Sequence, residues 1–387
     1  MHAVHASKIP PHMSQGGQKV QNISHFSCCV LALVVMCALG LNELTAQTNW
    51  REGLSVEVGG GFMVPHRPEL NRIVSGHSKS VMLAKEWEIN GTSRWHYHYA
   101  FPTFGVEVYA SDLGNRKELG RQLAFSAFGH FTLGRGKLND YLHFGAGVGF
   151  TDTKWDIDDN PQAIALGSTV NAAITLCYYM EKQFKSIDLY GGLRLTHLSN
   201  SAVVMPNLGT NNVMVSLGAR IKRDRSVPEP GIFTAHLPRT REWRLQYSLG
   251  LKQVTPAFSP FFFVHTLSAS YYRRPTWFKS YFIRTDLFYN SSLRYITERR
   301  GDDRITNAQL FQHGISLGWA QILGRSRLEV SLGTYTININ KSTGRFYNRL
   351  GFRHALPNNE HVELSINLMS HLAKAHHLEL GAAWRLR

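Results

Sequence analysis

Alternation of apolar and polar residues is the main pattern along this 387-residue chain. After residue 46, segments of about 8–14 residues carry apolar side chains at every second position and are separated by Gly, Asn, Asp, Lys and Arg. Because successive side chains of a strand point to opposite faces, this period predicts β-strands. In the first half they lie near 54–58, 80–89, 95–100, 104–108, 123–133, 142–150, 170–176, 187–195 and 213–221. In the second they lie near 243–251, 261–274, 278–290, 308–322, 326–339, 345–355, 360–369 and 376–386.

The N-terminal segment has a different pattern. An apolar run at 28–41 follows Lys8 and Lys19 and is too short to cross a bilayer as a helix. With the small residue Ala46 after it, this is the pattern of a secretory signal peptide, and we expect residues 1–46 to be removed on export. One cysteine, Cys177, then remains, which predicts that the exported chain has no intramolecular disulfide.

Charge points to the kind of partner. The formal net charge is +15 although only 18% of the residues are charged. Such a balance suits an anionic partner. Export, and a chain without a helical recognition pattern, argue against nucleic acid. A membrane surface with anionic lipids fits better.

Export together with alternating strands of about ten residues is typical of an all-β, transmembrane antiparallel β-barrel of the outer-membrane type. A secreted β-sandwich also alternates, but its strands are usually shorter. We expect 47–225 to form one β-barrel region, 226–241 a boundary loop, and 242–387 a second β-rich half. Because open sheet edges are not tolerated in lipid, we expect the second half to complete one barrel of roughly 14–16 strands. An eight-stranded barrel with an appended β-domain stays open.

One segment carries candidate chemistry. His197 and Ser199 continue the apolar, lipid-facing parity of the strand at 187–195, so the imidazole and hydroxyl lie on one face. A histidine can activate a serine as a nucleophile near neutral pH. Counting back along the next strand places Asn211 on the same face, where it could orient the imidazole. Asn207, in the loop between the strands, could donate an N–H to an oxyanion.

The order His197-Leu198-Ser199-Asn200, then Pro206-Asn207-x-Gly209-x-Asn211, resembles the active-site segment of the outer-membrane lipid A 3-O-deacylase (PagL) and acyloxyacyl hydrolase family. The similarity extends upstream through Gly114, Gly120, 145–147 and Ser168. It implies a barrel that removes an ester-linked acyl chain with a Ser–His–acid triad and neither metal nor cofactor. His197 would be the base and Ser199 the nucleophile, with Asn207, Asn200 and Gly209 in the oxyanion and substrate-binding segment. The acid's position holds Asn211, which leaves the triad incomplete.

The sequence therefore predicts an outer-membrane esterase whose partners are lipid A, or lipopolysaccharide, and the membrane itself. Two alternatives remain open: a non-catalytic barrel acting as porin, transporter or scaffold, which Asn211 favours, and a phospholipase that shares the nucleophile. The oligomeric state and the acyl position that is cut do not follow from the sequence.

Overall fold

The computed structural model describes residues 51–89, 93–222, 241–257, 259–301, 305–372 and 374–386. The expected signal peptide lies outside the described residues, as does the expected boundary loop apart from its last residue. Among the described residues, no helix has both the length and the apolar character needed to span a membrane.

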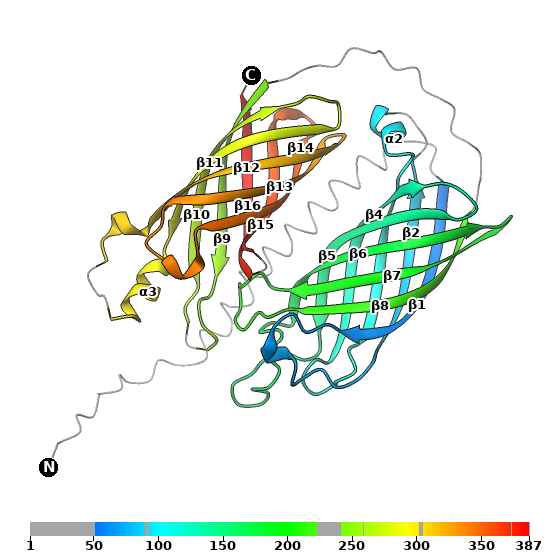
Figure 1. Cartoon of the computed structure of the whole chain (residues 1–387), viewed down its shortest axis with the longest axis horizontal. Coiled ribbons are helices and arrows are strands. Elements are labelled where there is room, and N and C mark those ends of the chain that lie inside the picture. Colours follow the sequence, from blue (N-terminus) through cyan, green and yellow to red (C-terminus); the bar gives the residue numbers. More distant parts are fainter. Residues whose placement is uncertain are drawn as a thin grey trace.

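The first half forms a closed antiparallel barrel of eight strands in sequence order (Figure 1). Closure comes from pairing of the first strand with the eighth, from Gly53 opposite Lys222 to Met63 opposite Asn212. The strands are β1 Arg51–Met63, β2 Ser78–Glu88, β3 Thr103–Asp112, β4 Arg121–Gly134, β5 Asn139–Thr151, β6 Val170–Gln183, β7 Ile187–Ser199 and β8 Thr210–Lys222. Two short helices, η1 Pro68–Leu70 and α2 Arg94–His98, lie in the connections.

The second half closes separately, also with eight strands, because β16 pairs with β9. Its strands are β9 Arg241–Lys252, β10 Phe262–Arg273, β11 Lys279–Asn290, β12 Phe311–Leu323, β13 Ser326–Ile337, β14 Phe346–Leu356, β15 Asn359–His371 and β16 Lys374–Leu386. Its helices are α3 Ser292–Glu298, η2 Asn307–Leu310 and η3 Lys341–Thr343. The expectation of one large barrel was therefore wrong, and the alternative, an eight-stranded barrel followed by a second β-domain, is correct. In each half the first and last strands pair with each other and leave no open sheet edge, so neither half needs the other for closure.

A second correction concerns 95–100, which we expected to be a strand. The chain instead forms helix α2, whose N-terminus is capped by the Ser93 backbone N–H donating to Nδ1 of His96 at 3.3 Å. The His96 ring is buried. Here the alternation of histidine and aromatic residues reflects local packing around a helical turn rather than two faces of a sheet.

Strand parity separates an apolar outside from a polar inside. On β1, Leu54 and Val58 are 63% and 58% exposed. Ser55 and Glu57, which lie between them in the sequence and point inward, are 4% and 2% exposed. The inward side chains fill each lumen with ion pairs. In the first barrel Arg194 contacts Glu57 at 2.8 Å and Glu107 at 3.0 Å. In the second, Arg349, Arg284 and Arg244 pair with Asp286, Glu329 and Glu363. Eight-stranded barrels are just wide enough for side chains to fill them.

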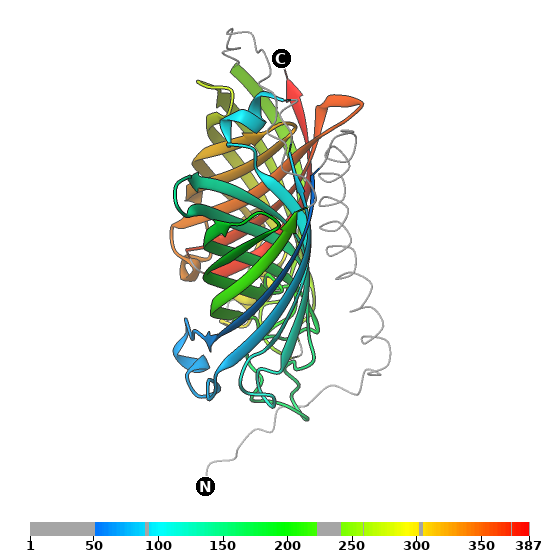
Figure 2. The same ribbon diagram turned by 90° about the vertical axis from the view of Figure 1, so that its right-hand side faces the viewer.

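The two barrels stand side by side with their longer connections at the same end, which we call the loop end (Figures 1 and 2). In the first barrel the loop end comprises 64–77, 113–120, 152–169 and 200–209. At the opposite end, His98, the last residue of α2, stacks on Phe278 with ring centroids 3.7 Å apart, and the Tyr99 hydroxyl donates to the Ile322 carbonyl at 3.1 Å. At the loop end, Gln253 contacts the loop 200–209 of the first barrel.

Candidate active site at the loop end of the first barrel

The structure brings His197 and Asn211 together on neighbouring strands. They are directly opposite each other in the antiparallel pairing of β7 with β8, and Nδ1 of His197 lies 2.7 Å from Oδ1 of Asn211. An amide oxygen only accepts hydrogen bonds, so Nδ1 of His197 carries the proton. The other ring nitrogen, Nε2, therefore holds the lone pair that a general base needs.

Ser199 ends β7 on the same face as His197, two residues further along. Its side chain is largely buried, with 8% of the residue exposed. Within the described residues, no hydrogen bond joins the Ser199 hydroxyl to the imidazole. Such contacts are often loose in a free enzyme and tighten when substrate binds. The geometry supplies the shared face and the short chain separation that a Ser–His pair requires.

Gly209 makes the close approach of loop and histidine possible. Its φ of +77° lies in the left-handed region that favours glycine, and its backbone N–H donates to the Ala165 carbonyl at 2.8 Å. A Cβ at this position would lie 2.9 Å from Cε1 of His197 and 3.5 Å from Cβ of Ser199. The backbone of Gly209 thus occupies the space beside both side chains.

Asn207 and Asn200 have different places in the loop. The Asn207 side-chain oxygen accepts the backbone N–H of Asn200 at 2.9 Å, which leaves its amide N–H groups available to a ligand. The Asn200 amide instead donates to the Ser168 hydroxyl at 2.9 Å and accepts from the Val204 backbone. Asn200 is 2% exposed, so the described contacts give it a role in holding the loop. Substrate contact by Asn200 stays a prediction.

Sequence reasoning missed two residues that touch this site. Nδ1 of His66, in the loop between β1 and η1, lies 2.7 Å from the amide nitrogen of Asn211. The Met205 backbone N–H donates to the side-chain oxygen of Gln253 at 3.0 Å, and the Gln253 backbone N–H donates to the Ala202 carbonyl at 2.9 Å. Both residues are distant in sequence, and no local pattern marks either one.

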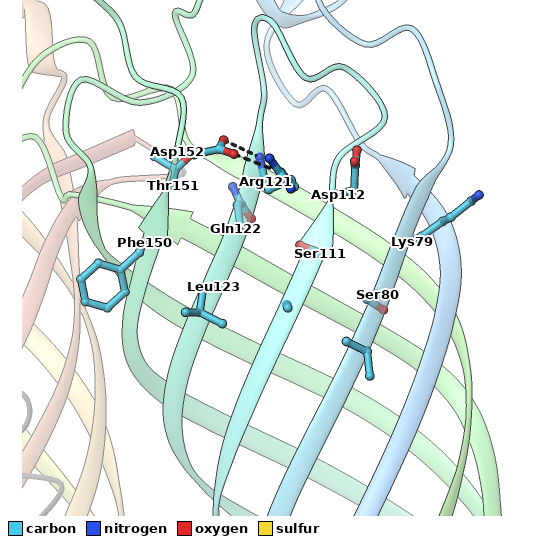
Figure 3. A pocket seen from close by; sticks show the side chains of 12 residues that line it. Lys79, Ser80, Ser111, Asp112, Arg121, Gln122, Leu123, Phe150, Thr151 and Asp152 are labelled. Atoms are coloured by element: carbon cyan, nitrogen blue, oxygen red, sulfur yellow. Dashed lines mark hydrogen bonds and ion pairs between the residues drawn. The ribbon is translucent and has the colours of Figure 1, made fainter.

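A separate hollow lies on the outer side of the first barrel, at the loop end of β2 to β5 (Figure 3). Its volume is about 720 Å³, with Leu123 and Phe150 below a charged rim. On that rim, the Arg121 guanidinium and the Asp152 carboxylate form an ion pair at 3.2 Å. The residues of this hollow do not include His197, Ser199 or Asn211, so it is distinct from the Ser–His site. Within the described residues, no group of three or more His, Cys, Asp or Glu side chains could hold a metal ion.

The fold and the site define a class: an antiparallel membrane β-barrel with an apolar outer face and a serine, a histidine and an amide at one end of two adjacent strands. Residues 80–220 match the family model "Lipid A 3-O-deacylase (PagL)", and residues 241–387 match "Acyloxyacyl hydrolase, C-terminal domain". Together the two models cover the second barrel and, apart from β1 and the ends of β2 and β8, the strands of the first. The chain belongs to this family of outer-membrane ester hydrolases.

Solved structures and curated proteins were also compared. The chain is similar to the crystal structure of the outer membrane enzyme PagL, with 18% identity over 44% of this chain and 98% of that one and a TM-score of 0.32. It is also similar to a mutant of Rh. blastica porin, with 9% identity over 87% of this chain and 100% of that one and a TM-score of 0.18. No curated protein matches the chain.

Proposed function

We propose that this protein hydrolyses an ester-linked acyl chain of lipid A, or of lipopolysaccharide, at the loop end of its first barrel. The observation that carries the proposal is the 2.7 Å contact between Nδ1 of His197 and Oδ1 of Asn211, next to Ser199. It fixes the imidazole tautomer that can take a proton from a serine. Membership of the lipid A deacylase family supports the choice of substrate.

The reaction begins with the Ser199 hydroxyl. Its oxygen attacks the acyl carbonyl while Nε2 of His197 takes the hydroxyl proton. The amide N–H of Asn207 stabilises the negative charge that develops on the carbonyl oxygen. The tetrahedral intermediate then breaks its bond to the sugar oxygen, which receives the proton from His197. A water molecule, activated by the same imidazole, cleaves the acyl–serine ester and releases a fatty acid.

The position of the site suits a substrate held in a membrane. Leu193 on β7 and Val215 on β8 are 54% and 64% exposed, and they lie on the same outward face as His197 and Asn211. A lipid whose acyl chains pack against this apolar face has its ester groups near the membrane surface, at the height of a strand end. The catalytic groups and the ester bond therefore meet without extraction of the lipid.

The filled lumens favour an enzyme over a porin. In the described residues of both barrels, buried arginines and carboxylates occupy the interior, with Arg194 and Arg284 at 0% and 1% side-chain exposure. Porins that conduct have about 16–18 strands and an aqueous interior. We therefore place the function on the outer surface of the first barrel rather than in a channel.

The test is acyl loss from lipid A by the detergent-folded protein, followed by mass spectrometry. The parent is expected to remove acyl chain, and Ser199→Ala and His197→Ala to remove none. Ser370→Ala is the matched control, because Ser370 lies next to His371 at the end of β15 in the second barrel. This variant should keep parental activity. A parallel reaction with glycerophospholipid separates a phospholipase from a lipid A deacylase. A folded parent that leaves lipid A intact, or an active Ser199→Ala, would overturn the proposal.

A further inference from the structure

Asn211 lies between two histidines. Its side-chain oxygen is 2.7 Å from Nδ1 of His197, and its side-chain nitrogen is 2.7 Å from Nδ1 of His66. The three side chains come from β7, β8 and the loop after β1, so the row exists only in the folded barrel. Asn211, at the position where the resemblance implies an acid, thus has a histidine contact at both its side-chain oxygen and its side-chain nitrogen.

The chemistry of the Asn211 amide determines which atoms donate and which accept in the row His66–Asn211–His197. The Asn211 nitrogen has only hydrogens to offer, so Nδ1 of His66 must be the acceptor, unprotonated at that nitrogen. The Asn211 oxygen has only lone pairs, so Nδ1 of His197 must carry a hydrogen. A flipped amide would reverse both contacts. It would place the hydrogen of neutral His197 on Nε2, where the ring could no longer accept a proton from Ser199.

The surroundings of His66 favour its neutral ring, in which one nitrogen can accept a hydrogen bond. Partial burial and the adjacent Arg67 guanidinium lower the pKa of His66, against a backbone hydrogen bond with Leu208 that raises it. The charged and titratable groups that face the ring are Arg67 and, across Asn211, the imidazole of His197. A neutral His66 has one unprotonated ring nitrogen, and the contact with the Asn211 amide nitrogen assigns this acceptor to Nδ1.

We propose that His66 is a positioning residue that holds the Asn211 amide with its oxygen toward His197, and so takes over the orienting task of the missing acid. A carboxylate offers acceptors on both oxygens and needs no such partner, whereas an amide has two unlike ends. His66 therefore fixes the orientation of the Asn211 amide, which the amide alone does not determine. The inference rests on the proposed function, because it requires His197 to act as the base.

The first test uses three substitutions at one position, assayed with lipid A in mixed detergent micelles. Removing the acceptor in His66→Ala is expected to lower kcat by roughly tenfold or more with little change in KM, since the wrong tautomer cannot take the serine proton. His66→Gln restores an acceptor oxygen and should recover much of that loss. His66→Lys offers donors only and should be at least as impaired as His66→Ala. His77→Ala, an exposed histidine in the same loop, is the matched control.

The second test repeats His66→Ala in an Asn211→Glu background. A glutamate accepts the hydrogen bond from Nδ1–H of His197 with either oxygen, so the loss caused by His66→Ala should shrink to less than about twofold. An equal loss in both backgrounds would show that His66 only supports the fold, and no loss in the parent background would show that it has no role. Either result overturns the inference while the Ser199→Ala comparison leaves the proposed function standing. An inactive parent overturns both.

Discussion

The backbone N–H of Met205 in the first barrel donates a hydrogen bond to the side-chain oxygen of Gln253 in the second, over 3.0 Å. Met205 belongs to the loop that carries Asn200 and Asn207. The same Gln253 amide donates to the Ser259 carbonyl at 3.0 Å, which fixes it to its own barrel. The second barrel thus contacts the candidate active site through the loop, not through the catalytic side chains.

This contact predicts that Gln253→Ala slows the reaction without unfolding either barrel. The loss of a loop hydrogen bond worth about 0.5–1.5 kcal/mol should lower kcat/KM by about two- to thirteenfold. Gln253→Glu keeps an acceptor for the Met205 N–H and should lose less. Gln162→Ala, an exposed glutamine in the loop 152–169, is the control. Equal kinetics for Gln253→Ala and the parent, measured by fatty-acid release, would contradict a bracing role.

Gly209 predicts a loss of activity from the smallest possible side chain. In Gly209→Ala the methyl group would meet the His197 ring, and we expect kcat to fall by roughly 10²-fold because the base is displaced. Gly344→Ala separates this clash from backbone strain. Gly344 has a φ of +80° with open space around it, so its alanine carries about 1–3 kcal/mol of backbone strain without a clash. If both variants lose activity equally, the clash is not the cause.

Asn207→Asp tests the oxyanion donor without disturbing the loop. An aspartate keeps the oxygen that accepts the Asn200 N–H, but it has no amide hydrogen to offer the substrate. Loss of one oxyanion donor should lower kcat by about 10²–10³-fold with KM nearly unchanged. The loop itself can be checked by limited proteolysis, which should give the parental pattern. A fully active Asn207→Asp would remove Asn207 from the mechanism.

Asn211→Glu should change the pH dependence as well as the rate. A carboxylate beside His197 stabilises the imidazolium and so raises the pKa of His197. As the pH falls, the unprotonated base is then lost at a higher pH than in the parent. The acid limb of the kcat/KM profile is therefore expected to move to higher pH by roughly one unit. Gln162→Glu adds the same charge at the same end of the barrel without contact to the site, and its profile should match the parent. An unmoved limb in Asn211→Glu would mean that residue 211 does not contact the base in solution.

The sequence by itself determined the strands, because a period of two is a local property of each segment. The expected strands near 278–290 and 376–386 lie within a residue or two of β11 and β16. The same parity placed His197 and Ser199 on the outward face, since their inward neighbours Arg194 and Thr196 are fully buried. Where a local cap competed with alternation, at Ser93 and His96, the pattern predicted a strand and the chain formed a helix.

Only the tertiary structure decided how many barrels there are and what surrounds Asn211. Closure depends on whether β8 pairs with β1 or with β9, and both pairings satisfy the same backbone groups, so the alternation cannot distinguish them. The approach of His66 to Asn211 joins residues 145 positions apart, and Gln253 reaches Met205 across 48. Such contacts follow from the closure and pairing of whole barrels, which no single segment of the sequence encodes.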